Sequence, residues 1–137
     1  MFFKTKFRFN FKKKNYALKC FLPNKVTNEY VRALNKNKFV RYNIKTNISK
    51  KNQKIYIKNI NSSNNKVILG LFNKKQLVGT VGLQRQTNKK FYIGIFIFNK
   101  KYLGIGLSKI MIKKAAKILK KNCETSYLFA NVNKKNI

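Results

Sequence analysis

One apolar segment, with the glycine-containing turn and the helix that follow it, constrains the fold of this chain most. Phe91–Phe98 (FYIGIFIF) is short and rich in β-branched and aromatic residues, which predicts a strand at the centre of a sheet. Leu107–Lys121 (LSKIMIKKAAKILKK) carries apolar residues at helical spacing, which predicts an amphipathic helix with a basic outer face. A chain of 137 residues has room for one such domain with one core.

Other segments predict further strands and two shorter helices around this unit. Thr27 is a candidate N-cap for a helix with Glu29 in its first turn, and Ser49 begins a second candidate helix. The Asn/Ser cluster Asn61–Asn65 predicts a loop. The remaining predicted strands are Tyr16–Leu22, Lys66–Phe72, Gln76–Gln86 and Tyr127–Val132. The order is therefore strand, two helices, three strands, a long helix and a strand.

The first fifteen residues are set apart by their composition. Phe7, Phe9 and Phe11 alternate with Arg8 and Asn10, a pattern that fits a strand, a basic arm or a leader. We expect residues 1–15 to form a basic, aromatic and disordered extension ahead of a domain over residues 16–137. No apolar run in the chain reaches the length that spans a bilayer.

The charge of the chain is extreme, with 33 Lys and Arg against 2 Asp and Glu, or +31 at pH 7. Such a charge favours partners rich in phosphate and makes nonspecific nucleic-acid binding possible. It also fits codon bias, because Lys, Asn, Ile, Phe and Tyr all have A/T-rich codons. The even spread from Lys4 to Lys135 favours the second explanation, since a nucleic-acid footprint usually gathers on one face.

Histidine is absent from the chain, and the two cysteines, Cys20 and Cys123, are far apart. A zinc site would lack ligands, and a Ser-His or Cys-His catalytic pair is excluded. We therefore expect no metal cofactor. Isolated reduced thiols indicate a cytoplasmic protein.

The segment that points to chemistry lies between the strand and the long helix. Lys101–Gly106 (KYLGIG) leads directly into the helix start. Gly104 and Gly106 have no Cβ to block a ligand, and a helix N-terminus attracts anions such as a pyrophosphate. The spacing is neither that of a Rossmann fingerprint nor that of a Walker loop.

This arrangement resembles the GNAT superfamily of N-acetyltransferases, whose cofactor signature is Arg/Gln-x-x-Gly-x-Gly/Ala between a central strand and a long helix. KYLGIG matches the signature, with Lys101 in place of Arg or Gln. Val132–Asn136 (VNKKN) resembles the V-N-x-x-N that ends the family's fifth strand. Val26–Tyr42 is similar to the acceptor-side helices of the branch that modifies amino sugars and protein N-termini. The resemblance extends from Pro23 to Ile137.

The resemblance implies transfer of acetyl from acetyl-CoA to a primary amine, on an amino sugar or a protein N-terminus. It implies a layered α/β fold with a mixed, mostly antiparallel sheet flanked by helices, lacking the last helix and two strands. Backbone groups of the central strand would bind the pantetheine arm, the turn would bind the pyrophosphate, and Lys101 would neutralise a phosphate. The implied cofactor-binding residues are Phe96, Ile97, Phe98, Lys101, Tyr102, Leu103, Gly104, Ile105, Gly106, Leu107 and Asn136.

The sequence also departs from the family's pattern. Tyr92 stands where many relatives carry a glutamate base, and neither Glu29 nor Glu124 is suitably placed, so the catalytic residues stay unassigned. The family's general-acid tyrosine lies in a helix that would follow Ile137. We therefore expect an incomplete domain, a partial or degraded copy whose catalysis is slowed about 10²–10⁴-fold and whose open sheet edge allows dimers. A non-catalytic, basic polyanion-binding protein is the alternative function.

Overall fold

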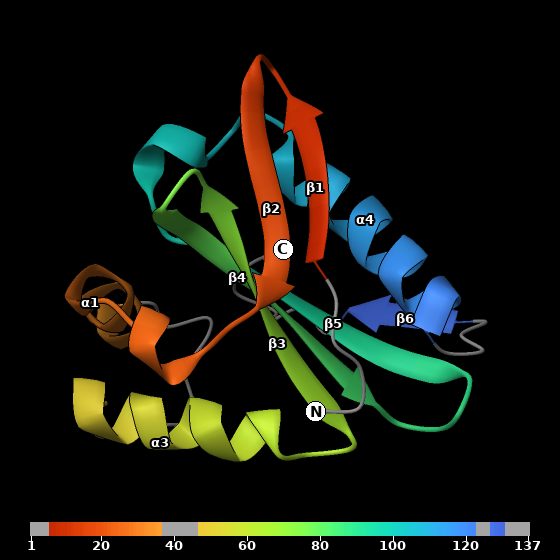
Figure 1. Ribbon diagram of the computed structural model, residues 1–137, viewed down its shortest axis with the longest axis horizontal. Coiled ribbons are helices and arrows are strands. Elements are labelled where there is room, and N and C mark those ends of the chain that lie inside the picture. The colour runs from red at the N-terminus through yellow and green to blue at the C-terminus, as the bar shows by residue number, and fades with distance from the viewer. Residues whose placement is uncertain (1–5, 37–46, 123–126, 131–137) are drawn as a thin grey trace.

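A computed structural model describes residues 6–36, 47–122 and 127–130, and these residues form a six-stranded sheet in the order β1-β2-β3-β4-β5-β6 (Figure 1). Neighbouring strands are antiparallel, except that β5 and β6 are parallel. The strands are β1 (Lys6–Phe11), β2 (Lys14–Cys20), β3 (Lys66–Asn73), β4 (Gln76–Arg85), β5 (Lys90–Ile97) and β6 (Tyr127–Ala130). The helices are α1 (Asn28–Lys36), α3 (Lys50–Asn61) and α4 (Leu107–Asn122), with 3₁₀ turns η1 (Pro23–Lys25) and η2 (Lys100–Tyr102). The predicted fold class, a mostly antiparallel sheet flanked by helices, is confirmed.

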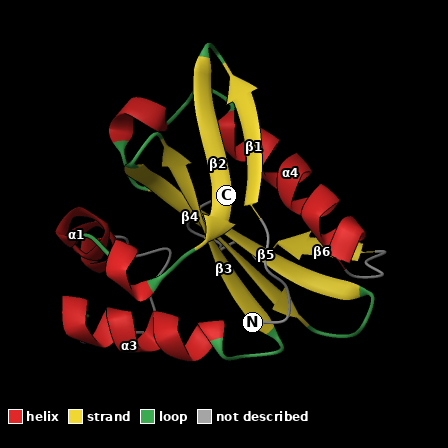
Figure 2. Cartoon of the chain, in the orientation of Figure 1, coloured by secondary structure: helices red, strands yellow, loops and turns green. Residues whose placement is uncertain are grey.

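The helices cover the two faces of the sheet separately, and together they make three layers (Figure 2). On one face, Leu107 and Met111 of α4 pack on sheet residues such as Leu69 and Val81. A smaller set on the other face joins α1 and α3 to the sheet, and it consists of Phe21, Val26, Tyr30, Val31, Leu34, Ile57, Ile68, Phe72 and Leu77. Because side chains alternate along a strand, one sheet supplies both cores.

Both predicted helix starts are confirmed. The Thr27 hydroxyl oxygen accepts the Tyr30 N–H at 3.1 Å, and the Ser49 hydroxyl oxygen accepts the Asn52 N–H at 3.1 Å. Each cap satisfies one of the N–H groups that a helix leaves open in its first turn. These caps fix where α1 and α3 begin on their face of the sheet.

The expected disordered extension over residues 1–15 is wrong for residues 6–15, which form β1 and the turn into β2. Lys12 and Lys13 make a two-residue hairpin turn with φ of 48° and 64°, a turn type that matches the twist of paired strands. Phe9 is buried, and Phe7 and Phe11 are half-buried against the same core under α4. A disordered arm would leave these three rings in water, which is why the strand forms.

The expectation that Phe91–Phe98 lies at the sheet centre is also wrong. β5 is the fifth of six strands in the sheet order, whereas β3 and β4 lie in the middle. Val67–Phe72 of β3 are all buried, while β5 is only half-buried from Ile95 onward. The apolar composition of β5 therefore reflects contacts with two separate cores as well as burial in the sheet.

The close approach of β4 to β5 at Gly79 yields a stability prediction. A Cβ at Gly79 would lie 2.5 Å from the Phe96 carbonyl oxygen and 3.1 Å from the Ile97 Cα, and backbone cannot move aside cheaply. We expect Gly79→Ala to lower the free energy of unfolding by about 1–3 kcal/mol, measured by urea denaturation. Gly94→Ala on β5 is the matched control, because a Cβ there meets nothing within 4 Å. Equal losses for the two variants would contradict this packing.

Candidate cofactor-binding site

The turn between β5 and α4 is held in place by one buried tyrosine. Tyr102 is 2% exposed, and its hydroxyl accepts from Asn73 Nδ2 at 2.9 Å and donates to Gln76 Oε1 at 3.4 Å. Asn73 and Gln76 flank the turn between β3 and β4. The Asn99 side-chain oxygen accepts the Lys101 N–H at 3.0 Å and shapes the start of η2. The turn therefore has a fixed conformation on the sheet edge.

The two glycines of this turn adopt a backbone conformation that other residues rarely take. Gly104 has φ of 71° and Gly106 has φ of 86°. A Cβ at Gly104 would meet nothing within 4 Å, and at Gly106 the nearest atom would be Phe11 Cζ at 3.8 Å. The glycines thus leave open space in front of the backbone, and protein packing does not fill it.

Backbone N–H groups face this open space without acceptors. Within the described part of the chain, the N–H groups of residues 104–109 donate no hydrogen bond, and the first hydrogen bond of α4 runs from the Ile110 N–H to the Gly106 C=O at 3.4 Å. α4 is 16 residues long, so its dipole adds partial positive charge at this end. Three lysines that are close to this turn in the sequence have exposed side chains: Lys100, Lys101 and Lys109. This combination of groups has the chemistry that binds an anion such as a pyrophosphate, which makes the turn a candidate site.

A second part of the site, called the fork from here on, is the edge of β5 that faces away from β4 beyond Ile93. The described pairing of β5 with β6 runs from Lys90 to Ile93, whereas β5 stays paired with β4 as far as Ile97. Beyond Ile93, one edge of β5 has no described strand beside it. This edge continues to the end of β5 that leads into η2 (Figure 1).

The register of β4 with β5 decides which peptide groups face the fork. The Phe98 N–H donates to the Val78 C=O at 3.4 Å, and the Gln86 N–H donates to the Lys90 C=O at 2.9 Å. Hydrogen-bonded pairs alternate along an antiparallel ladder, so the even-numbered residues of β5 bond to β4. The peptide groups of Ile95 and Ile97 consequently point into the fork.

Aromatic rings line the α1 side of β5 near the fork. Tyr30 of α1 lies 6.3 Å from Phe96 and 5.7 Å from Phe98, ring centroid to ring centroid, and the two phenylalanine rings are 5.8 Å apart. The Gln53 side-chain amide donates to the Tyr30 hydroxyl at 3.1 Å, and both side chains are buried. Burial raises the pKa of Tyr30 to about 12, so this hydroxyl is neutral near pH 7.

The site residues expected from the sequence separate into three groups. Those of the turn, from Lys101 to Leu107, lie together around the open space at the start of α4. Phe96 and Phe98 turn their rings toward α1, and only Ile97 of that trio directs its peptide groups into the fork. Asn136 lies outside the described residues.

The departures from the family pattern can also be located. Tyr92 is half-buried on the paired part of β5, where its ring lies 6.0 Å from that of Phe129. Glu29 is exposed in the first turn of α1, and Glu124 lies outside the described residues. In the part of the chain that the structure describes, no three His, Cys, Asp or Glu side chains gather, and no helix has the length and hydropathy to span a membrane.

Sequence reasoning missed the contribution of the β1–β2 hairpin to this site. Phe11 lies beside Gly106, and the Lys14 ammonium lies 4.8 Å from the centre of the Tyr102 ring. The Tyr16 ring makes an edge contact with Tyr102 at 6.2 Å. The alternation of phenylalanine with polar residues in residues 7–11 was the signal that could have placed the hairpin here.

Comparison with protein families identifies the chain's class. Residues 27–137 match the model of the acetyltransferase (GNAT) family, and the chain belongs to that family. It is therefore an acetyl-CoA-dependent acyltransferase by family. No curated protein matches the sequence significantly.

Solved structures share the fold at low sequence identity. A GNAT-family acetyltransferase from Streptococcus pneumoniae is 20% identical, with TM-score 0.62 over 88% of this chain and 76% of that chain. The PaiA N-acetyltransferase from Thermoplasma acidophilum, solved with coenzyme A, is 17% identical, with TM-score 0.66 over 88% and 81%. Glucosamine-6-phosphate N-acetyltransferase from Arabidopsis thaliana is 11% identical, with TM-score 0.65 over 88% and 84%.

Removing the hydroxyl groups of two buried tyrosines is expected to have opposite effects on stability. Tyr30→Phe leaves the buried Gln53 amide without its acceptor, so we expect a loss of about 1–3 kcal/mol in the free energy of unfolding. Replacing both residues (Tyr30→Phe with Gln53→Met) should recover most of that loss.

Tyr16 is buried as well, but its hydroxyl has no partner among the described residues, so Tyr16→Phe should be neutral or stabilising. Chemical denaturation measures all three, and a destabilised Tyr16→Phe would contradict the assignment.

Proposed function

We propose that this chain transfers acetyl from acetyl-CoA to a primary amine carried by an amino sugar or a protein N-terminus. The observation that carries the proposal is the positive-φ glycine turn at the start of α4, which follows the end of β5. An extended acyl carrier needs peptide groups along its arm and N–H groups at its phosphates, and this stretch of chain offers both.

Acetyl-CoA supplies an activated thioester, and named groups of this chain would hold it. The peptide groups of Ile95 and Ile97 would bond the pantetheine arm, in place of those of Phe96 and Phe98. The N–H groups from Gly104 to Leu107 would receive the pyrophosphate, and the space that a Cβ at Gly104 would occupy is open for it. Lys101 would add a charge without the planar fork of an arginine.

The positive charge of the chain also affects the protonation of the acceptor amine. An amine must lose its proton before it attacks a thioester carbonyl, and Tyr92 offers no carboxylate for that step. Surrounding cations disfavour a further positive charge, so they lower the pKa of an arriving ammonium group. The same cations favour the negative charge that leaves on the thiol sulfur. We assign no residue as general acid or base.

The acceptor would lie on the α1 side of the fork. The half-buried rings of Phe96 and Phe98, packed against the buried Tyr30, make an apolar wall, which suits the face of a sugar ring or a small N-terminal side chain. A polycationic amine is disfavoured by the net charge of +31. The Arabidopsis relative in fold, by its name, acts on glucosamine 6-phosphate, which combines an amine with an anionic group.

The cofactor prediction uses asparagine, which tolerates positive φ but carries a side chain. Gly106→Asn should lower the melting temperature less than other side chains would at this φ of 86°, while filling the space in front of the turn. Loss of charged hydrogen bonds of about 1.5–3 kcal/mol should weaken acetyl-CoA binding about 10- to 100-fold, measured by calorimetry. Gly82→Ala on β4 is the control, because its Cβ would make only an ordinary contact at 3.9 Å. Unchanged binding by Gly106→Asn would refute the assignment of this turn.

The acceptor prediction compares three amines through release of free CoA thiol. We expect kcat/KM to rank glucosamine 6-phosphate above glucosamine, and both above spermidine. The gap between the phosphorylated sugar and spermidine should shrink as salt is added, because screening weakens the long-range field. A preference for spermidine at low salt would contradict the electrostatic argument. No thiol release with any of these amines, or with peptides that carry a free N-terminus, would contradict the proposed activity.

A further inference from the structure

The face of the β1–β2 hairpin that points away from α4 carries an unusual set of side chains. Phe7, Phe9 and Phe11 use the other face for the core, so Lys6, Arg8 and Asn10 share this one. The register places Lys6 opposite Lys19, Arg8 opposite Ala17, and Asn10 opposite Asn15. Along the ladder, a pair of lysines is therefore followed by an arginine opposite an alanine and then by a pair of asparagines.

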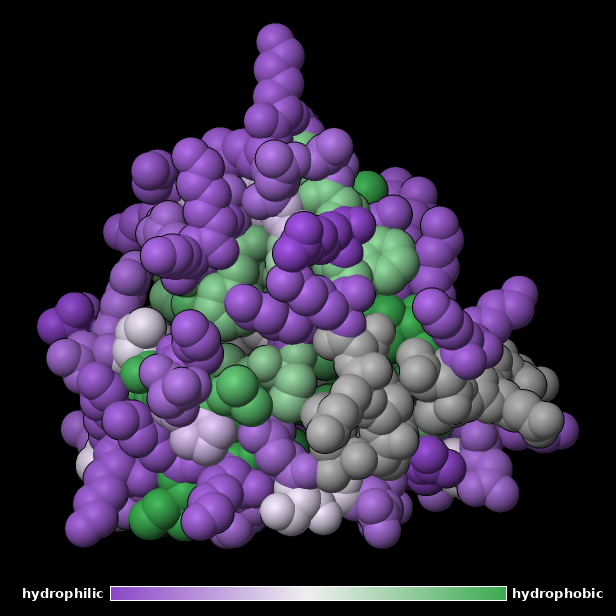
Figure 3. All heavy atoms as spheres, in the orientation of Figure 1, coloured by the Kyte–Doolittle hydropathy of each residue, from purple (hydrophilic) through white to green (hydrophobic). Residues whose placement is uncertain are grey.

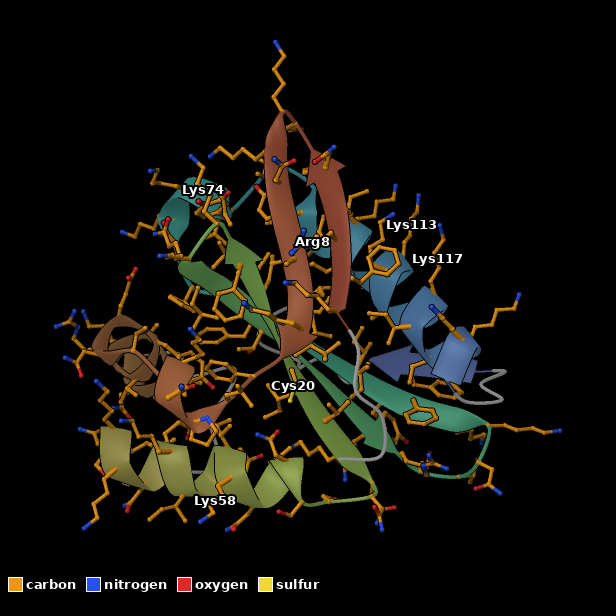
Figure 4. The ribbon with its side chains drawn as sticks, in the orientation of Figure 1. Arg8, Cys20, Lys58, Lys74, Lys113 and Lys117 are labelled. Atoms are coloured by element: carbon orange, nitrogen blue, oxygen red, sulfur yellow. The ribbon has the colours of Figure 1, made fainter. Side chains whose placement is uncertain are left out.

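This face is hollowed rather than flat. A hollow of about 450 Å³ is lined by these side chains together with Phe72 and with Lys74, from the β3–β4 turn. Ala17 is small, and it leaves room between the longer side chains around it. The Lys19 ammonium lies 4.5 Å from the centre of the Phe72 ring, which holds that charge over the sheet. In Figure 3, hydrophilic side chains gather over this part of the molecule, and Figure 4 shows Arg8 in front of the hairpin.

The cations of the hollow repel one another without a compensating carboxylate. Like charges directly opposite on paired strands are destabilising. Partial desolvation, and then the nearby charges of Lys6, Lys25 and Arg8, lower the pKa of Lys19. Glu29 is the one acidic residue in the described part of the chain, and it does not line the hollow. An anion bound there would relieve this repulsion.

Protection of a sheet edge does not account for the arrangement. Lysines on an edge strand discourage pairing with another chain, and β1 is an edge of the described sheet. Lys19 and Ala17, however, belong to β2, which is paired on both sides by β1 and β3. A charge on an interior strand gives no such protection, so the cross-strand set needs another explanation.

We propose that this hollow binds phosphate esters, from a nucleotide or from a single nucleic-acid strand. Arg8, Lys19 and Lys74 supply positive charge, and the amides of Asn10 and Asn15 supply further hydrogen-bond donors at one end. Most of the lining of the hollow lies on β1 and β2, which precede residues 27–137, the part matched by the family model, and the hollow shares no residue with the turn at Gly104 and Gly106. The proposal therefore stands or falls independently of acetyl transfer.

The test must separate a site from the attraction that any protein of charge +31 exerts on polyanions. The site variant combines Arg8→Gln, Lys19→Gln and Lys74→Asn. The matched control combines Lys58→Gln on α3 with Lys113→Gln and Lys117→Gln on α4, three exposed cations that lie on other elements (Figure 4). Both variants lose three charges, so their nonspecific electrostatics fall equally. Binding of a labelled single-stranded RNA is measured by anisotropy over a range of salt, with AMP as competitor.

We expect the site variant to bind the RNA at least about tenfold more weakly than the control, since three phosphate contacts are lost. The slope of log K against log salt should fall by about two for the site variant, at roughly 0.7 for each contact with a single strand. Competition by AMP would identify a nucleotide site, and its absence would identify a strand site. Equal losses in the two variants would overturn the proposal. Amide chemical shifts of wild type titrated with AMP or RNA give a second readout, and changes confined to residues outside the hollow would overturn it too.

Discussion

The cofactor turn depends on a single buried ring, that of Tyr102. Its hydroxyl bonds to Asn73 and Gln76 of the β3–β4 turn, and its faces and edges meet Lys14 and Tyr16 of the β1–β2 hairpin. Three connections that are distant in sequence therefore meet at one side chain. Because interiors are closely packed and change volume at a cost, this ring fixes where the glycine turn stands relative to the sheet. The ring therefore also fixes the position of the N–H groups at the start of α4.

The parts of the fold that could be predicted from the sequence are those with a local signal. Thr27 and Ser49 marked helix starts because a side-chain oxygen near a free N–H acts within a few residues. The long helix was marked by its 3.6-residue period. The order of strands in the sheet is a non-local property, so the apolar composition of β5 gave no means to tell a central strand from the fifth of six.

As with the fold, only the part of the candidate site that has a local sequence signal could be predicted. Gly104 and Gly106 stood out because positive φ selects for glycine, and both have it. Which residues of β5 turn their peptide groups into the fork depends on the register with β4, and a shift of one residue exchanges Phe96 for Ile97. The hairpin was missed because the first fifteen residues are rich in basic and aromatic types and so fit the composition of a disordered arm, although Phe7, Phe9 and Phe11 share one face.

A chain with 33 basic and 2 acidic residues attracts anions over its whole surface, so charge alone selects no ligand. Binding one anion in preference to others requires donor groups held in fixed positions, which water and dissolved ions do not provide. In the proposed cofactor site, the glycine turn would offer them through N–H groups with fixed directions, which discriminate a phosphate from a diffuse counterion layer. The hollow offers such groups through cations held against Phe72 and against each other on paired strands. Specificity in this protein consequently lies where the backbone constrains the charge, and the freely exposed lysines of α3 and α4 set only the long-range attraction.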